Sequence, residues 1–236
     1  LNELNELNKL PEYLLLENVK TIKAATNIDD LKQWLSFLES LGYSNNDCMI
    51  LNSLDFGVPQ DRERAFIVSH LGEKLDIDSK IEASKQERKF KIRKFIKTNY
   101  KNKTYKVEAD IAQLNKTPSR DVMWDINGKK ITNYTIIRTI TCNMDRTHTA
   151  ALFKYNGAKG DTYRRLTMRE AFLLMGFTED EYVKAKSLNY SYRKLNKLIG
   201  NSIVVNVLQA IFDAMFGDEF RKQNPNNPGN DTNIGV

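Results

Sequence analysis

One carboxylate and three polar or cationic side chains stand at spacings that could support chemistry on a substrate developing negative charge. Glu17 follows the apolar run LLL, and Gln60, Arg62 and Arg64 alternate in the segment QDRER. A carboxyl group that holds a proton beside a guanidinium donor can stabilise negative charge as it forms. On a strand, Arg62 and Arg64 would share one face because side chains alternate with a period of two. Taken alone, however, a glutamate at a strand end and two arginines in a loop are most simply surface residues.

Short apolar runs predict the strands that would carry these side chains. The stretch 11–19 indicates a strand rather than a helix because Pro11 precedes its apolar residues. Two more strands, at 48–51 and 65–69, are separated by the turn-rich NSLDFGVPQDRER. A helix between the first two strands completes an alternation that predicts part of an open α/β sheet.

That first helix is indicated by five apolar residues at helical spacing. Asn27 and Asp30 are spaced for an N-terminal cap, and Gly42 stands at the expected end. The five residues are Leu31, Trp34, Leu35, Leu38 and Leu41.

Helices are predicted again after residue 163. Two successive capping boxes, which begin at Thr167 and Thr178, predict a helix over 168–175 and another after Thr178. Arg169 and Glu170 are then most simply a helix start and its cap. A last amphipathic helix is expected after Asn201, followed by a disordered polar tail over 218–236.

The middle of the chain is strongly basic. Residues 81–165 hold 20 lysines and arginines against 8 aspartates and glutamates, a net charge of +12, whereas the remainder carries −6. Such a segment suits phosphate contacts, since each neutralised phosphate releases counterions. A solvated lysine-rich helix over 84–97 is an equally good reading. Composition also indicates a globular cytoplasmic protein, because no apolar run approaches the length of a membrane span and no signal pattern is present. The two cysteines have neither disulfide nor metal-site spacing.

Four segments, in this order, resemble the later motifs of the DNA cytosine-5 methyltransferases. They are LLLENV at 14–19, LNSLDFGVPQDRERAFIVS at 51–69, RRLTMREAFLLMGF at 164–177 and LIGNSIVVNVLQAI at 198–211. A lone ENV or GN means nothing, but this ordered combination around a basic insert is specific. The resemblance implies the C-terminal part of a methyltransferase-type open α/β sheet over 1–72, a target-recognition domain over 73–163, and helices over 164–217 that return to the catalytic domain.

For the reaction, the resemblance implies covalent chemistry on a cytosine flipped out of duplex DNA. In that family a cysteine thiolate adds to ring carbon 6, and the resulting enamine takes a methyl group from S-adenosylmethionine. Glu17 would contact the ring nitrogen and amino group, and Arg64 would donate to the carbonyl oxygen. Arg62 would support the site or a DNA phosphate, and Gln60, counted with the DNA contacts, would bond the catalytic loop or backbone.

The resemblance also implies contacts to the cofactor and to DNA. Val19 would pack beside the cofactor pocket, and Asn201 and Ser202 would meet the methionine part of the cofactor. RTIT at 138–141 resembles a short element near the end of the recognition domain. It supplies Arg138, Thr139 and Thr141 as DNA contacts, with Thr139 the best candidate for a phosphate. Asn143, Arg146 and His148 could each read a base edge, although a phosphate contact or a plain surface position is the simpler reading of each.

Two family motifs are missing from these 236 residues. There is no Gly-x-Gly for a cofactor loop, and neither Cys48 nor Cys142 follows a proline, as the family's nucleophile does. We therefore expect that this chain alone does not methylate DNA and needs an N-terminal methyltransferase half, in the same longer chain or as a separate subunit. The alternatives are a non-catalytic DNA-binding remnant and an unrelated α/β protein. The retained QxRxR element and Glu17 favour the enzyme, because a pure binding protein needs no cytosine pocket.

Overall fold

The computed structural model describes residues 1–96, 106–107, 136–144, 152–154 and 163–223, and the chain divides into two compact units. Unit 1 comprises Leu1–Leu51, Glu63–Lys85 and Leu208–Val236; unit 2 comprises Asn52–Arg62 and Gln86–Val207. The helices between 164 and 207 thus group with the insert and not with the sheet. The domain boundaries expected from the sequence stay predictions.

Unit 1 is organised around one long strand, β5 (Glu63–Leu71). The strands β1 (Tyr13–Val19) and β2 (Tyr43–Asn45) pair antiparallel with β5 on its two sides, and β3 (Met49–Asn52) also pairs with β5. The three strands expected from the apolar runs are confirmed. β2 was not expected, because Tyr-Ser-Asn has no apolar run and becomes a strand through its pairing with β5. Among the described residues, no strand pairs with the outer edge of β1.

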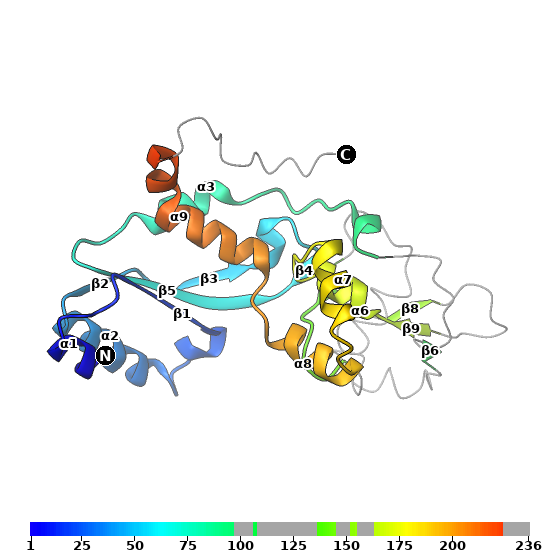
Figure 1. The fold of residues 1–236 in the computed structure, drawn as a ribbon, viewed down its shortest axis with the longest axis horizontal. Coiled ribbons are helices and arrows are strands. Elements are labelled where there is room, and N and C mark those ends of the chain that lie inside the picture. Colours follow the sequence, from blue (N-terminus) through cyan, green and yellow to red (C-terminus); the bar gives the residue numbers. More distant parts are fainter. Residues whose placement is uncertain (97–105, 108–135, 145–151, 155–162, 224–236) are drawn as a thin grey trace. The chain divides into compact units, whose positions relative to one another are not determined.

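Helices cover both faces of β5, which explains its unbroken apolar run. Figure 1 shows α2 (Ile28–Ser40) on one face of the sheet and α3 (Ile77–Ser84) with α9 (Val205–Gln223) on the other. Five consecutive residues at the centre of β5 are accordingly buried: Ala65, Phe66, Ile67, Val68 and Ser69. Burial of a large apolar side chain such as Phe66 or Ile67 contributes about 1.5–3 kcal/mol. The short elements α1 (Asn2–Glu6) and η1 (Lys20–Lys23) complete unit 1.

The expected cap of α2 is not formed as predicted. Asn27 does precede the helix, but its Nδ2 donates to Thr21 O at 2.8 Å instead of its side chain accepting from the helix amides. The other end agrees with the sequence, because Gly42 adopts a φ of +92°, a conformation that glycine adopts without steric cost.

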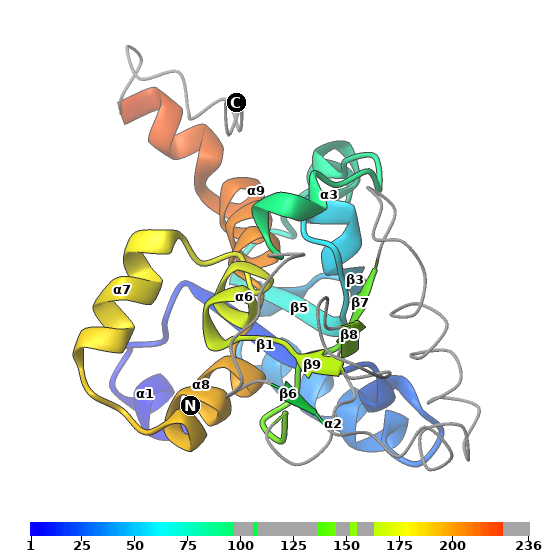
Figure 2. The ribbon, with the colours of Figure 1, turned by 90° about the vertical axis from the view of Figure 1, so that its right-hand side faces the viewer.

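The described part of unit 2 contains short strands and the α-helices α6, α7 and α8. β4 (Gln60–Asp61) pairs parallel with β7 (Ile137–Arg138), and β9 lies between β6 and β8. The helix α6 contacts both α7 and α8 (Figure 2). The remaining bounds are β6 Lys106–Val107, β8 Leu152–Lys154, β9 Tyr163–Arg165, η2 Ser53–Phe56, η3 Ile92–Lys94, α6 Met168–Leu173, α7 Glu179–Ser187 and α8 Tyr192–Asn201.

Both predicted capping boxes are confirmed, at the starts of α6 and α7. Thr167 Oγ1 accepts from Glu170 N at 3.1 Å, and Glu170 Oε2 accepts from Thr167 N at 2.9 Å. The same glutamate forms a two-bond ion pair with Arg164, both contacts at 2.9 Å, and both side chains are 1% exposed. Glu170 is therefore a cap and a buried ion-pair partner at once.

The insert begins without the basic helix predicted over 84–97. α3 ends at Ser84, and only the short η3 follows. The reason is the spacing of the buried residues Phe90 and Ile96: six positions apart on a helix they would point in different directions, so one helical face could not bury both. Residues 86–88, which lead into this segment, are held by Asp55. Arg88 Nε and Nη2 donate to the Asp55 carboxylate at 2.5 and 3.0 Å, and Gln86 N donates to Asp55 O at 2.8 Å.

The C-terminal helices also differ in extent from the prediction. α8 was not expected as a separate helix, and α9 continues to Gln223, past residue 218 where a disordered tail was predicted. The stretch Tyr192–Gly217 has the length and mean hydropathy of a membrane span, which the sequence reading did not anticipate. It is not a continuous span, because residues 202–204 separate α8 from α9.

Candidate functional site

The structure brings Glu17, Val19 and Arg64 together on one face of the β1–β5 pair. Val19 lies opposite Arg64 and Glu17 opposite Phe66, so Glu17 and Arg64 are diagonal neighbours. Arg64 Nε lies 3.3 Å from Glu17 Oε1, in an ion pair whose side chains are 19% and 29% exposed respectively. The pairing of these strands, and not the local sequence, positions the two groups.

Each member of this pair keeps one polar atom uncommitted. Arg64 Nη1 donates to Glu63 O at 2.8 Å, and its Nε faces Glu17. Within the described part of the chain, Arg64 Nη2 and Glu17 Oε2 have no hydrogen-bond partner. Burial lowers the pKa of Arg64 from its usual range while the charge of Glu17 raises it, and an arginine so placed stays a cation at neutral pH. The pair thus offers a carboxylate oxygen and a charged donor side by side.

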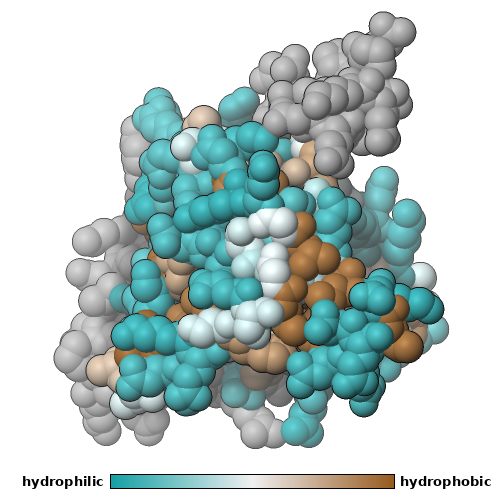
Figure 3. All heavy atoms as spheres, turned by 90° about the vertical axis from the view of Figure 1, so that its left-hand side faces the viewer, coloured by the Kyte–Doolittle hydropathy of each residue, from teal (hydrophilic) through white to brown (hydrophobic). Residues whose placement is uncertain are grey.

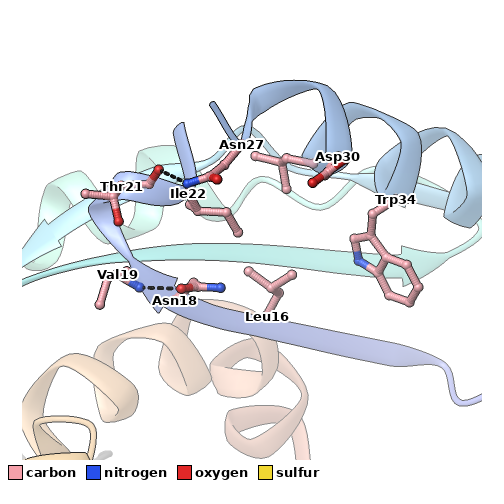
Figure 4. A pocket seen from close by; sticks show the side chains of 9 residues that line it. Leu16, Asn18, Val19, Thr21, Ile22, Asn27, Asp30 and Trp34 are labelled. Carbon is pink, nitrogen blue, oxygen red and sulfur yellow. Dashed lines mark hydrogen bonds between the residues drawn. The ribbon is translucent and has the colours of Figure 1, made fainter. Parts of the chain in front are cut away.

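Two pockets open beside β1. One, of about 320 Å³, lies between the end of β1 and α2, where Asn18, Asn27, Asp30 and Trp34 supply polar and aromatic lining (Figure 4). The other, of about 470 Å³, is lined mainly by leucines of β1 and α2 and reaches Glu17. Figure 3 shows an apolar area bordered by hydrophilic side chains on the face that carries α1 and α2. Both pockets adjoin the strand whose outer edge carries no paired strand among the described residues.

Asn18 and Val19, the other residues of ENV, differ in role. Asn18 Oδ1 accepts from Val19 N at 2.8 Å (Figure 4), a local structural hydrogen bond. Val19 is 47% exposed and lines the smaller pocket. Its expected contact with a cofactor stays a prediction.

Gln60 is buried in unit 2, which argues against its predicted place among the DNA contacts. Its side chain has no exposed area. Its Nε2 donates to Leu174 O at 2.6 Å, and its Oε1 accepts from Ile140 N at 2.9 Å. Both ends of the amide are therefore hydrogen-bonded to main-chain groups. The resemblance implied a bond either to the catalytic loop or to the backbone, and the backbone bond is the one present.

Arg62 is also buried in unit 2 and is held by main-chain oxygens. Nη1 donates to Ile140 O at 2.8 Å, and Nη2 donates to Gly200 O at 3.1 Å and to Ser202 O at 2.8 Å. With 3% exposure it cannot meet a phosphate in this conformation. The geometry supports a structural role for Arg62 and speaks against the catalytic assignment.

Asn201 and Ser202 end α8 and precede α9. Asn201 is exposed, and its side chain makes no hydrogen bond within the described residues, so it can meet a ligand. Ser202 Oγ donates to Leu198 O at 2.9 Å. The backbone amides of Ser202 and Val205 are already committed, to Ile199 O at 3.2 Å and Met175 O at 2.9 Å. The cofactor contact expected of Asn201 and Ser202 stays a prediction.

The residues expected at the DNA are only partly described. Arg138 has a buried Nε without a hydrogen-bond partner among the described residues. Thr139 Oγ1 donates to Asp61 O at 2.6 Å, so this hydroxyl is already committed. Thr141 is half-buried. Arg146 and His148 lie outside the described residues.

Two residues near these positions were missed by sequence reasoning. Asn196 is fully buried, and its Nδ2 donates to Cys142 O at 3.0 Å. Gly200 lies so close to the backbone of residues 141–142 that a Cβ would stand 2.1 Å from Cys142 N. The signal for Asn196 was its place in the apolar stripe of α8, between Leu195 and Ile199.

Exposed cations line the start of the insert, within unit 2. They lie on either side of the buried Phe90 and suit contact with a polyanion: Lys89, Lys91, Arg93 and Lys94.

The two thiols are half-buried, and Cys48 lies just before β3. Burial raises the pKa of its thiol, and the charge of Lys23 lowers it by less. Within the described ranges, no group of three or more His, Cys, Asp or Glu side chains could hold a metal ion.

Sequence comparison gives one family match and several relatives. The family of C-5 cytosine-specific DNA methylases matches residues 5–217. The orphan methyltransferase M.SssI of Spiroplasma monobiae is 30% identical over 220 residues, which cover 90% of this chain and 55% of that protein. The type II methyltransferase M2.ScrFI of Lactococcus lactis subsp. cremoris is 32% identical over 212 residues, with coverages of 89% and 55%. The chain thus spans about half the length of these relatives.

Solved structures show the same fold. The S. pombe Dnmt2 methyltransferase superposes with a TM-score of 0.66 at 21% identity, covering 92% of this chain and 70% of that one. The Entamoeba histolytica methyltransferase EhMeth gives a TM-score of 0.63 at 17% identity, with coverages of 92% and 68%. The described elements therefore form an α/β methyltransferase fold with an open sheet and helices.

Proposed function

Because the chain belongs to the family of C-5 cytosine-specific DNA methylases, we propose that it is the C-terminal portion of an enzyme that methylates cytosine in duplex DNA. The methyl donor is S-adenosylmethionine, and the target base is flipped out of the duplex. The observation that carries this proposal is the Glu17–Arg64 pair, in which each side chain keeps one polar atom free.

The pair can serve the ring of a cytosine whose negative charge grows during attack by a nucleophile. A carboxyl at Glu17 holds a proton at the ring nitrogen and accepts from the neighbouring amino group. Arg64 donates to the carbonyl oxygen, where its permanent charge stabilises the electrons that arrive. The 3.3 Å contact orients the two side chains toward each other before the base enters, so they need to move little when it binds.

The cofactor contacts are proposed for Asn201, Ser202 and Val19. Bound S-adenosylmethionine supplies an electrophilic methyl group. Asn201 offers an exposed side-chain amide at the end of α8, and Ser202 follows it at the start of the turn into α9. Val19 offers an exposed apolar surface.

We propose that an N-terminal methyltransferase half completes the enzyme and brings the cysteine nucleophile and the glycine-rich cofactor loop. The outer edge of β1 pairs with no described strand, and it offers backbone groups that a further strand could bond. The apolar pocket of about 470 Å³ beside it suits side chains from such a partner. The two relatives are also nearly twice as long as the matched region.

Duplex DNA is the proposed substrate, and the exposed cations at the start of the insert favour a phosphate contact. They would serve equally in a DNA-binding remnant without chemistry, which is the alternative function. We expect either protein to act in the cytoplasm.

The test is methyl transfer from labelled S-adenosylmethionine to mixed-sequence duplex DNA. The 236-residue chain alone should transfer nothing, and addition of the cognate N-terminal half should restore incorporation at carbon 5 of cytosine. Activity of the chain alone would refute the need for the second half. DNA binding without methylation, even with that half bound, would favour the remnant.

A further inference from the structure

The segment 139–142 of unit 2 is fixed at successive positions by hydrogen bonds to residues outside the insert. Thr139 Oγ1 donates to Asp61 O, and Cys142 O accepts from Asn196 Nδ2. Between them, both backbone groups of Ile140 are bound: its N donates to Gln60 Oε1 at 2.9 Å, and its O accepts from Arg62 Nη1 at 2.8 Å. The segment thus has little freedom of its own.

Gln60 and Arg62 replace a strand partner at Ile140. The parallel pairing of β4 with β7 covers Gln60 with Ile137 and Asp61 with Arg138, and then stops. Beyond it, two side chains make the bonds to the N–H and C=O of Ile140 that a neighbouring strand would otherwise make. All of these groups are buried, where a lost partner is costly.

The same two side chains extend to the turn between α8 and α9 and to the end of α6. Arg62 Nη2 donates to Gly200 O and Ser202 O, and Gln60 Nε2 donates to Leu174 O. Gly200 also lies directly against the backbone of 141–142, where no larger residue fits. Segment 139–142 and the α8–α9 turn therefore share the same fixed partners.

We propose that Gln60, Arg62, Asn196 and Gly200 form an anchor that makes segment 139–142 and the α8–α9 turn move as one body. These are positioning residues. The inference rests on the proposed function for what each end contacts, namely DNA at Thr141 and the cofactor at Asn201 and Ser202. Its consequence is that binding at one end changes affinity at the other, because a shift of either end moves the shared anchor.

The first experiment tests the anchor without any assumption about function. Hydrogen exchange at Ile140 N is measured in the 236-residue chain and in the variants Gln60→Met and Arg62→Lys. Methionine keeps the approximate shape without an amide, and lysine keeps the charge without the planar fork that reaches three carbonyls. We expect exchange at Ile140 N to accelerate at least about tenfold in both variants. Exchange of the β5 amides should stay unchanged, and the control variant Lys197→Gln should leave exchange at Ile140 N unchanged. Unchanged exchange at Ile140, or equal acceleration in β5, would overturn the anchor.

The second experiment tests the coupling in the enzyme joined to its N-terminal half. The dissociation constant of S-adenosylhomocysteine is measured with and without duplex DNA. We expect DNA to change it by about fivefold or more in the wild type, and this factor to fall towards one in Arg62→Lys and Gly200→Ala but not in Lys197→Gln. A purely structural role would lower the active fraction and leave the factor unchanged, and that result, or a wild-type factor of one, would overturn the coupling. If the joined wild type bound neither ligand, the proposed function would fail, and hydrogen exchange would still decide on the anchor.

Discussion

Glu17→Gln tests whether the Glu17–Arg64 pair acts on the reaction or only on the fold. The change keeps the shape of the side chain and removes its charge and its acid. At 3.3 Å the gross attraction between the two charges is about 5 kcal/mol for an effective dielectric constant of about 20. Loss of hydration cancels most of it: exposed pairs contribute about 0.2–1 kcal/mol to stability, and this half-buried pair should lie near the upper end of that range. The free energy of unfolding should therefore fall by less than about 1 kcal/mol.

The loss in the chemical step should be much larger. Removing one preorganised group that faces developing charge lowers the rate on the order of 100- to 1,000-fold, which is about 2.7–4 kcal/mol. Binding of duplex DNA should be nearly spared, because that charge is absent before attack. Arg64→Ala should behave in the same way.

The assay is single-turnover methylation by the joined enzyme, with DNA affinity measured in parallel. Glu63→Gln is the matched control. Glu63 precedes Arg64 in β5, its side chain lies on the opposite face of the strand, and the change removes only a surface ion pair with Lys20. If Glu17→Gln kept near-normal turnover while losing DNA affinity, or if Glu63→Gln lost as much rate, Glu17 would be a structural or phosphate contact.

Three further outcomes are expected. Glu170→Gln should lower the free energy of unfolding by about 3–5 kcal/mol in urea titration, because it breaks a buried ion pair and leaves the charge of Arg164 unbalanced; a loss below about 1 kcal/mol, the range of surface pairs, would contradict this. The second outcome concerns four exposed cations replaced with glutamine: Lys89, Lys91, Arg93 and Lys94. The slope of log binding constant against log salt, measured by fluorescence anisotropy, should flatten by up to about 0.9 per residue replaced. An unchanged slope would exclude these residues from the DNA contact. Iodoacetamide should alkylate Cys48 more slowly than a free thiol at neutral pH, and faster as pH rises, because burial raises its pKa. Rapid alkylation at neutral pH would contradict the burial. The raised pKa of Cys48 also contributes stability at pH values below the usual pKa of a thiol, and this contribution is lost as pH rises through the pKa of the folded state.

Much of the sheet and several helices could be predicted because their signals are local. The apolar run of β5, the leucine spacing of α2 and the capping boxes at Thr167 and Thr178 each specify their own element. β2 and the segment 84–97 could not be predicted in the same way, because the first depends on its partner strand and the second on two buried residues whose environment is tertiary.

The candidate site shows the same division. Family resemblance picked out Glu17 and Arg64, and the register of β1 with β5 places them side by side. It gave Arg62 a supporting place in the site or a contact to a DNA phosphate, and it could not show that this side chain is buried. What separates them is that Arg62 is surrounded by the main-chain oxygens of Ile140, Gly200 and Ser202, and these contacts span up to 140 positions of sequence.

The short stretch 52–62 fastens both ends of the insert, Asp55 near its start through Gln86 and Arg88, and Gln60 near its end through Ile140. What lies between two such fixed ends is, in thermodynamic terms, a closed loop. The entropy of closing a loop grows only with the logarithm of its length, so doubling the length costs about 0.6 kcal/mol. Length alone in this stretch therefore costs little, whereas its contacts, such as the burial of Phe90 and Ile96 and the pairing of β6 with β9, cannot be lost as cheaply. A change of length between residues 107 and 136 should therefore alter the free energy of unfolding little, because both fastening points and the pairing of β6 with β9 stay in place.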